Sequence, residues 1–566
     1  MRFIHKMIIG LINKKTSADG RRVMKRLQQI TTSPMEAQKK FLQTLLSDNR
    51  DTEFGKKYDF ASIRSIEQYR ERIPVSSYDD YAEAISRMTE KGETNILTVY
   101  PVSHYSKSSG TMGNPKHIPF SDRSARLSDD YTKSYIYAML EKNGLLSTNP
   151  SLTLIESVLS TLPCGATCGS YTAKSNMNNK FFIENLFTPP FEVMVPKGYM
   201  NSRHLHAFFA LKEKNLSSAL CAFYSYFLEV LRYIEKNWEI LADDIEMGTI
   251  DDSIQMPKEL RTHLLCKLRP DPERATEIRR IFNQPSTLPL VPRLWPQFKY
   301  LVGIGTAGFS TYTEKLKTYF GPDIHFVMYG VVASEAVFSV PIRLDSGESV
   351  LLPDSVFYEF LPEGESDYSR LLTMDQLEVG RNYEIVMTNT SGLYRYKMRD
   401  VVHVVGMYNN TPTIEFLYRA DQTVNLVGEK TTEYALRQVV KQTVAKCGFE
   451  MIDYCMYPNP DAVPVRYEFL IEPVHLPDNF DYESVREELD KALSKANPSM
   501  GDKLDKGIVG KSQLYFLQEE TTLLYRDMMI MKGVSSAQLK PVRVIDNLLK
   551  KNFFYVLIDK RFKRPE

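Results

Sequence analysis

Ser108-Ser109-Gly110-Thr111-Met112-Gly113-Asn114-Pro115-Lys116 brings together hydroxyl side chains, two glycines and a lysine. It follows an apolar run at 97–102 and leads into a second apolar segment at 118–120. The glycines let several backbone N–H groups turn towards one ligand, while the hydroxyls add donors and the lysine adds positive charge. The stretch therefore predicts a phosphate-binding loop. It lacks the Gly-Lys-Ser/Thr ending of a Walker A loop, and an ordinary Ser/Gly surface turn is the alternative.

The composition is that of a soluble globular protein. The chain has 566 residues, 43% of them hydrophobic and 25% charged, and this length predicts two or more domains. A net charge of +1 gives no global field that favours a nucleic-acid partner. Of the 6 cysteines only Cys164 and Cys168 are close in sequence, so no zinc-binding set is expected. Free thiols are typical of the cytoplasm, where we expect the protein to reside as a monomer.

The N-terminal segment carries its longest apolar run at 7–12, interrupted by Gly10. This run is too short to span a bilayer, so it predicts an amphipathic helix and no stable membrane insertion. Weak contact with a membrane surface is a minor alternative.

A helix start is predicted at Ser33-Pro34-Met35-Glu36, with a serine N-cap, a proline in the first turn and a glutamate at the capping-box position. Its buried stripe would be Phe41, Leu42, Leu45 and Leu46. The following segment, Thr52-Glu53-Phe54-Gly55-Lys56, has the composition of a loop.

A longer helix is predicted over 121–140, where Tyr131, Tyr135 and Tyr137 are more typical of a core than of ligand contacts. Further on, the glycines of 303–308 follow an apolar strand in a formal Gly-x-Gly-x-x-Gly pattern. A dinucleotide site there is disfavoured because no acid follows at the expected distance of about 20 residues, Asp323 being too near.

Two carboxylates lie next to predicted strands. Glu335 comes just after a strand at 324–329, where a carboxylate is well placed to bind a cation or a ligand hydroxyl. Asp400 directly precedes the strand at 401–405 and could accept two hydrogen bonds from a ribose diol. The alternatives are a solvated loop acid for Glu335 and, for Asp400, a salt bridge to Arg395 or Arg399.

The pattern breaks near Arg419-Ala420-Asp421, and we place a hinge there. The predicted fold is α/β, with a large N-terminal multi-sheet domain over 1–424 and a small mobile C-terminal α/β domain over 425–566. The small domain would contain a helix that opens at 428–433, strands at 465–471 and 514–517, and a second helix between these strands. The buried face of that helix would be Val485, Leu489, Ala492 and Leu493.

Taken together, the sequence resembles the Gretchen Hagen (GH3) acyl-acid amido synthetases, within the adenylate-forming superfamily. The resemblance runs over nearly the whole chain, and its landmarks occur in the family's order. They are Thr52-Glu53-Phe54-Gly55, Ser108-Ser109-Gly110-Thr111-x-Gly113-x-x-Lys116, Ala333-Ser334-Glu335, Tyr394-Arg395-Tyr396 with Asp400, Glu429-Lys430-Thr431-Thr432-Glu433, and Gln538-x-Lys540-x-x-Arg543.

The resemblance implies an adenylate-forming fold and an enzyme that uses ATP and Mg²⁺. Such an enzyme adenylates a small carboxylic acid and passes the acyl group to an amine, typically that of an amino acid. Lys430 and Lys540 would be catalytic, and Glu335 would face the nucleotide or bind the metal. The resemblance also implies nucleotide contacts from Ser108, Ser109, Gly110, Thr111, Lys116, Ser334, Asp400 and Arg419, and acyl or adenine contacts from the 303–308 loop.

Two positions depart from the family pattern. Arg399 stands where glycine usually precedes the aspartate, and Val331 stands where a tyrosine is usual, with Tyr329 two residues earlier. Two other functions stay open at this stage. One is an acyl-adenylating enzyme with a thiol or hydroxyl acceptor, and the other is a non-catalytic nucleotide binder. A dinucleotide oxidoreductase ranks below both.

Overall fold

The computed structural model describes residues 2–107, 116–306, 310–420, 423–476, 480–534 and 539–560. These residues pack into two compact units, of which one extends to Phe416 and the other begins at Leu417. The boundary that the sequence predicts lies further along the chain, at residue 424.

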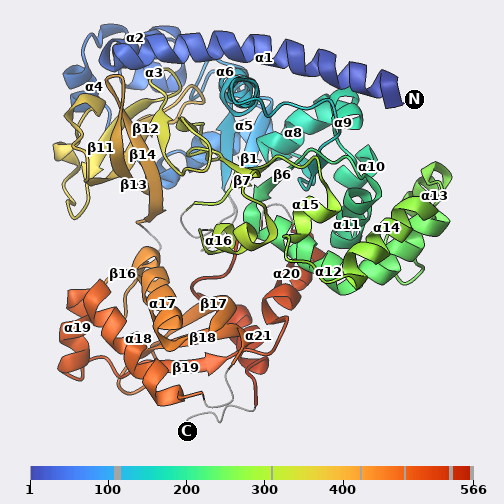
Figure 1. The fold of residues 1–566 in the computed structure, drawn as a ribbon. Coiled ribbons are helices and arrows are strands. Elements are labelled where there is room, and N and C mark those ends of the chain that lie inside the picture. Colours follow the sequence, from blue (N-terminus) through green and yellow to red (C-terminus); the bar gives the residue numbers. More distant parts are fainter. Residues whose placement is uncertain are drawn as a thin grey trace. The chain divides into compact units, whose positions relative to one another are not determined.

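The described part of the first unit contains three sheets (Figure 1). One is parallel with the order β3-β6-β7-β8, one is mixed with the order β2-β1-β5-β4, and one has the order β11-β12-β13-β14-β10-β9. Their strands are β1 His104–Lys107, β2 His117–Phe120, β3 Leu152–Thr153, β4 Leu159–Thr161, β5 Thr167–Gly169, β6 Ser218–Phe223, β7 Tyr300–Ile304, β8 His325–Met328, β9 Ser339–Pro341, β10 Ser349–Leu351, β11 Phe357–Pro362, β12 Asn382–Thr388, β13 Tyr396–Tyr408 and β14 Thr411–Arg419.

Helices surround these sheets. They are α1 Arg2–Thr32, α2 Pro34–Asp48, α3 Glu53–Lys57, α4 Ile66–Arg72, α5 Ala82–Lys91, α6 Asp122–Ser128, α7 Tyr135–Lys142, α8 Tyr171–Asn178, α9 Lys180–Leu186, α10 Phe191–Met194, α11 Ser202–Lys212, α12 Tyr224–Met247, α13 Lys258–Lys267, α14 Pro272–Asn283, α15 Leu290–Leu294 and α16 Ser310–Tyr319. Among the described residues no helix is both long enough and apolar enough to cross a bilayer.

The second unit is a smaller α/β structure. Its main sheet has the order β17-β18-β19, and a short ribbon joins β15 to β16. The elements are β15 Thr423–Val424, β16 Thr431–Thr432, α17 Glu433–Cys447, β17 Glu450–Asn459, β18 Arg466–His475, α18 Tyr482–Ala496, α19 Pro498–Asp505, β19 Gln513–Phe516, α20 Thr521–Met531 and α21 Leu548–Val556. The multi-sheet large unit and the small α/β unit confirm the predicted fold class.

Helical periodicity predicted the buried faces well. In α18 the predicted stripe of Val485, Leu489, Ala492 and Leu493 is the buried set. In α2 the predicted Phe41, Leu42, Leu45 and Leu46 are all buried. Tyr131 and Tyr135 are core residues, as expected.

Local capping differs from the prediction at two places. Ser33 makes no side-chain capping bond to α2, so the expected capping box does not form there. The predicted loop at 52–56 is instead the short helix α3, because the Thr52 hydroxyl accepts a hydrogen bond from the Gly55 amide at 2.9 Å. Gly55 is required in that helix, since a Cβ there would lie 2.0 Å from the Asn49 carbonyl oxygen.

Candidate functional site

The predicted phosphate loop connects two adjacent strands. β1 and β2 pair in antiparallel register, with Lys107 opposite His117, and Ser108, Ser109, Gly110 and Thr111 lie outside the described residues. Lys116 follows the loop, and its Nζ lies 5.3 Å from the centroid of the Tyr78 ring. The Tyr78 hydroxyl in turn accepts a hydrogen bond from the His117 amide at 3.1 Å. The base of the loop is therefore fixed by strand pairing and by Tyr78.

A cluster of buried hydroxyls ties this hairpin to a distant part of the chain. Ser121 and Ser124 follow β2, whereas Thr390 and Ser391 follow β12, and all four residues are buried. The Ser121 amide donates to the Ser391 hydroxyl at 3.0 Å, and the Ser124 hydroxyl lies 2.7 Å from that of Thr390. These bonds hold the hairpin that carries the phosphate loop against the segment that leads to Asp400.

The Glu335 turn is attached to the same segment. Asn389, which precedes Thr390, donates from its side-chain amide to the Glu335 carbonyl oxygen at 3.0 Å. The turn itself is closed by a hydrogen bond from the Ala333 amide to the Ala336 carbonyl at 2.9 Å. Glu335 is buried, with 7% of its surface exposed, and Ser334 is half-buried. The segment after β2, the Glu335 turn and the segment after β12 thus meet around Asn389, Thr390 and Ser391, although more than fifty residues separate each from the next.

These stretches also share one hydrophobic core. Ile118 of β2, Ala336 of the turn and Met398 of β13 belong to the same buried cluster, and so does Val331. Val331, which departs from the family pattern, is therefore a core residue. Tyr329 is hydrogen-bonded to β7 through its backbone amide, which donates to the Gly303 carbonyl at 3.1 Å.

Tyr394 and Arg395 stabilise the fold of this region. The Tyr394 ring stacks on Phe54 with centroids 4.7 Å apart, which joins the N-terminal landmark to the third motif. Arg395 forms a buried ion pair with Glu359, with nitrogen–oxygen distances of 2.9 and 3.0 Å. Arg399 lies 3.6 Å from Glu384 and donates to the Tyr368 hydroxyl at 2.9 Å. Both arginines thus pair with glutamates rather than with Asp400, which is buried on β13.

Arg399 keeps the backbone that a glycine would adopt at this position. Its φ is +61°, in the left-handed region that an L side chain occupies at a cost of about 1–2 kcal/mol. It lies where the pairing of β12 with β13 shifts register. The contacts with Glu384 and Tyr368 offset this strain.

We expect Arg399→Gly to be more stable than Arg399→Ala by about 1 kcal/mol, because glycine removes the left-handed strain and alanine does not. Both variants lose the same side-chain contacts, so the free energies of unfolding from urea titration isolate the backbone effect. Equal stability of the two variants would contradict the strain assigned to this position.

The glycines of the 303–308 segment have a packing role. A Cβ on Gly305 would lie 2.3 Å from the Tyr224 ring, and one on Gly303 would lie 2.7 Å from the Cys221 carbonyl oxygen. Gly303 thus admits the neighbouring strand β6 against β7, and Gly305 admits the start of α12. Gly308 lies outside the described residues. A cavity of about 530 Å³ opens beside Gly305 and Thr306 and is also lined by Glu314, Lys317, Asp345 and Glu415, among others.

Lys430 occupies a rigid turn in the second unit. It is exposed, and its φ of +50° is left-handed. The carboxylate of the buried Glu429 accepts hydrogen bonds from the amides of Leu426 and Val427 at 2.6 and 2.8 Å and from the Tyr467 hydroxyl at 2.8 Å. Burial opposes the charge of this carboxylate, but these donors outweigh it and lower the pKa of Glu429. Glu429, the neighbour of Lys430, is therefore an ionised side chain with a structural role, because its hydrogen bonds fix the turn.

Two further cations predicted from the sequence, Lys540 and Arg419, belong to the second unit as well. Lys540 is exposed in a segment without regular structure. Three residues later, Arg543 binds the Asp453 carboxylate and donates to the Tyr454 carbonyl at 2.9 Å. Arg419 ends β14 and is half-buried.

Sequence reasoning missed a charged cluster beside the hairpin. The helix expected over 121–140 contains a π-helical segment, Asp129–Ser134, and such segments are frequent at functional sites. The Tyr171 hydroxyl donates to Asp129 at 3.1 Å, and the Tyr171 ring packs 4.7 Å from that of Phe120 in β2. Burial raises the pKa of Asp129 and lowers the pKa of Lys133. Periodicity gave no signal for this cluster, because the extra residue of a π turn leaves no mark in the sequence.

Lys133 is the member of this cluster that lacks a hydrogen-bonding partner. Its Nζ lies 4.0 Å from the centroid of the Phe182 ring, and among the described residues it makes no hydrogen bond or ion pair within 4 Å. Asp129 is close enough to favour its charge. A half-buried ammonium of this kind is a group to which an anionic ligand would be attracted.

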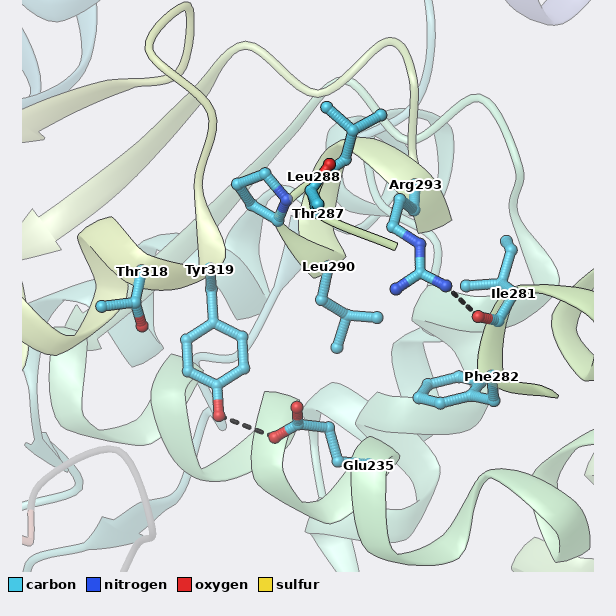
Figure 2. Close-up of a pocket in the computed structure, with 10 residues that line it drawn as sticks. Glu235, Ile281, Phe282, Thr287, Leu288, Leu290, Arg293, Thr318 and Tyr319 are labelled. Atoms are coloured by element: carbon cyan, nitrogen blue, oxygen red, sulfur yellow. Dashed lines mark hydrogen bonds between the residues drawn. The ribbon is translucent and has the colours of Figure 1, made fainter. Parts of the chain in front are cut away.

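A second cavity, of about 470 Å³, lies away from all these residues between α12, α14, α15 and α16 (Figure 2). Its charged groups already have partners within the wall. Glu235 accepts a hydrogen bond from the Tyr319 hydroxyl at 2.6 Å, and Arg293 donates to the carbonyls of Ile281 and Gln284. None of the residues predicted from the sequence lines it.

Glu335 is the residue predicted from the sequence to bind a metal ion. Among the described residues no group of three or more His, Cys, Asp or Glu side chains is arranged to hold a metal ion. Mg²⁺ in nucleotide sites usually takes one or two carboxylates and completes its shell with phosphate and water oxygens. Glu335, as a buried carboxylate, is of the type that this requirement asks for.

Comparison with solved structures defines the class of fold to which the protein belongs. The fold is that of adenylate-forming ligases: a solved structure of 2-hydroxyisobutyryl-CoA ligase with bound 2-HIB-AMP aligns with a TM-score of 0.51 at 11% identity, over 95% of this chain and 92% of that one. The GH3.15 acyl acid amido synthetase aligns with a TM-score of 0.83 at 22% identity, over 94% of this chain and 96% of that one.

Sequence comparison then gives the family. The N-terminal, central and C-terminal domains of the GH3 family match residues 23–324, 349–419 and 434–548. The chain belongs to the GH3 family. It is 27% identical to the indole-3-acetic acid-amido synthetase GH3.3 of Arabidopsis thaliana over 467 residues, covering 78% of this chain and 77% of that protein. It is 29% identical to GH3.8 of Oryza sativa subsp. indica over 462 residues, covering 78% of this chain and 76% of that protein.

Proposed function

We propose that the protein is an ATP-dependent acyl-acid amido synthetase. The observation that carries this proposal is the meeting of the phosphate-loop hairpin, the Glu335 turn and the segment before Asp400 around Asn389, Thr390 and Ser391. Family membership and the names of the relatives support the same reaction. We further propose that the protein acts as a cytoplasmic monomer, with the domains 1–424 and 425–566 as the parts that move.

In the first half-reaction the substrate carboxylate oxygen attacks the α-phosphorus of ATP, and the bond to pyrophosphate breaks. Both reactants are anions, so positioning and charge neutralisation supply most of the catalysis. Ser108, Ser109, Gly110, Thr111 and Lys116 would hold phosphate oxygens, Asp400 the ribose hydroxyls, and Ser334 and Arg419 further nucleotide groups. Glu335 would contribute a ligand to Mg²⁺, which when bound neutralises phosphate charge.

Lys430 would bridge the α-phosphate and the carboxylate during this step. In the second half-reaction the amino-acid nitrogen attacks the acyl carbon, the bond to AMP breaks, and the nitrogen loses a proton. Lys540, on the small domain, would reach the site in one domain orientation only.

The carboxylic acid would bind near Lys133. This ammonium lacks an acceptor among the described residues, and it is linked through Asp129 and Tyr171 to the hairpin of the phosphate loop. A bound carboxylate would supply the missing acceptor.

We expect Lys133→Ala to raise the KM for the acid at least about tenfold, the value of one charge-assisted hydrogen bond, while the KM for ATP stays within about twofold. Because burial lowers the pKa of Lys133, its charge is lost at a lower pH than for an ordinary lysine. The wild-type KM for the acid should therefore increase as the pH rises through that lowered pKa. Lys133→Arg, which does not titrate, should remove this dependence, and an unchanged KM in Lys133→Ala would disprove the role.

The reaction is tested by ATP–pyrophosphate exchange across a panel of carboxylic acids, followed by a panel of amino acids with the best acid. Acid-dependent exchange and an amide product are the expected results. A thioester formed with coenzyme A would instead support a thiol acceptor, and tight ATP binding without acid-dependent AMP release would support a non-catalytic nucleotide binder.

A further inference from the structure

Helix α1 exposes an apolar stripe near its N-terminal end. Ile4, Met7 and Leu11 are 63%, 53% and 65% exposed, whereas Ile9 is 1% exposed. The exposed residues are spaced by three and four positions, which places them on one face of the helix. Large apolar side chains that gather on one exposed face, rather than being scattered singly, are typical of a surface that meets a partner.

The opposite face of α1 is fixed to the first unit, so the stripe faces outwards. Asn13 donates from its side chain to the Ser147 carbonyl oxygen at 2.8 Å, and Gly10 lies against Thr148. Further along, Val23 and Leu27 pack in the core with Tyr131 and Tyr135. Figure 1 shows α1 as one continuous helix along the outside of this unit, so the stripe stands on a rigid support.

Positive charge flanks the stripe. The sequence from 4 to 18 contains three lysines and no acidic residue. Lys14 and Lys15 are exposed and follow Leu11 by three and four residues, so at 100° per residue they lie on either side of the stripe. An apolar face bordered by lysines is the pattern of a helix that lies in the plane of a membrane interface.

We propose that the outer face of α1 is a reversible docking surface for a membrane that contains anionic phospholipids. The apolar side chains would enter the boundary between headgroups and acyl chains, and the lysines would be attracted to the anionic headgroups. A second copy of this chain is a poorer occupant, because a stable interface needs about 800 Å² from each partner, far more than three side chains present. This inference does not depend on the proposed enzyme reaction.

Co-sedimentation with vesicles tests the proposal. The full-length protein should pellet with vesicles of phosphatidylcholine mixed with phosphatidylserine, and much less with phosphatidylcholine alone. Met7→Ser/Leu11→Ser and Lys14→Ala/Lys15→Ala should each lower the partition coefficient about tenfold or more. The matched control is Leu548→Ser/Val556→Ser on α21, whose side chains are each 72% exposed and which should bind as the wild type does.

Thermal melting curves of the variants show whether they are folded, and all substituted positions are exposed, so unchanged curves are expected. Failure of the wild type to bind the anionic vesicles would overturn the proposal, and so would equal binding by the Met7→Ser/Leu11→Ser variant. A concentration-dependent dimer in light scattering that this variant dissolves would also overturn it, in favour of a second copy.

Discussion

Lys430→Ala is expected to reduce acid-dependent ATP–pyrophosphate exchange by about a hundredfold or more while leaving the protein folded. A cation positioned against the negative charge that develops in the transition state raises the rate by at least that factor. The side chain is exposed, and the shape of its turn is set by Glu429, Tyr467 and Asn497, so its removal costs little stability. Exchange rates and thermal melting of the same samples measure the two effects separately.

Two further variants sharpen this test. Lys441→Ala removes an exposed lysine from α17 in the same unit and should leave exchange unchanged. Lys430→Gly removes the cation and also the strain of a φ of +50°, so it should be inactive yet at least as stable as Lys430→Ala. Exchange at the wild-type rate in both Lys430 variants would remove the catalytic role.

The sequence predicts the structure correctly at places where it depends on residues that are close together in the chain. The stripe of α18 and the buried face of α2 follow from apolar spacing alone. The capping of α3 by Thr52 was missed because a Thr-x-x-Gly stretch has the composition of a loop, and only the folded geometry shows the hydroxyl accepting from Gly55.

The sequence contains the motifs of the predicted site, but it does not show which of them lie together in the fold. Nothing in the sequence couples Ser124 to Thr390, whose hydroxyls lie 2.7 Å apart, since hydroxyl–hydroxyl pairs carry no charge or spacing signal. Arg399 departs from the family pattern as a residue type, yet its φ of +61° preserves the backbone of a glycine. Backbone conformation at such a position is set by the strand pairing around it, which sequence periodicity does not encode.

The second large effect is expected at the buried ion pair of Arg395 and Glu359, whose disruption should lower the stability of the fold. Glu359 is 1% exposed and also accepts a hydrogen bond from Arg70 Nε at 2.9 Å. Arg395 is 5% exposed and donates to the carbonyls of Arg70 and Ile73 at 2.9 and 2.7 Å. This pair therefore fastens the α4 segment to β11 and to the backbone directly before β13, the strand that carries Asp400.

We expect Glu359→Ala to lower the free energy of unfolding by about 3–5 kcal/mol, because it leaves the Arg395 guanidinium buried without its counter-charge. Glu359→Met/Arg395→Met should recover much of that loss, since an apolar pair of similar volume avoids the unpaired charge. The matched control is Glu378→Ala, which breaks an ion pair with Arg381 whose side chains are 64% and 66% exposed and should cost at most about 1 kcal/mol. Urea titrations of the four proteins decide the matter: if the single and double variants at 359 and 395 unfold at the same urea concentration, the loss comes from packing and not from the buried charge.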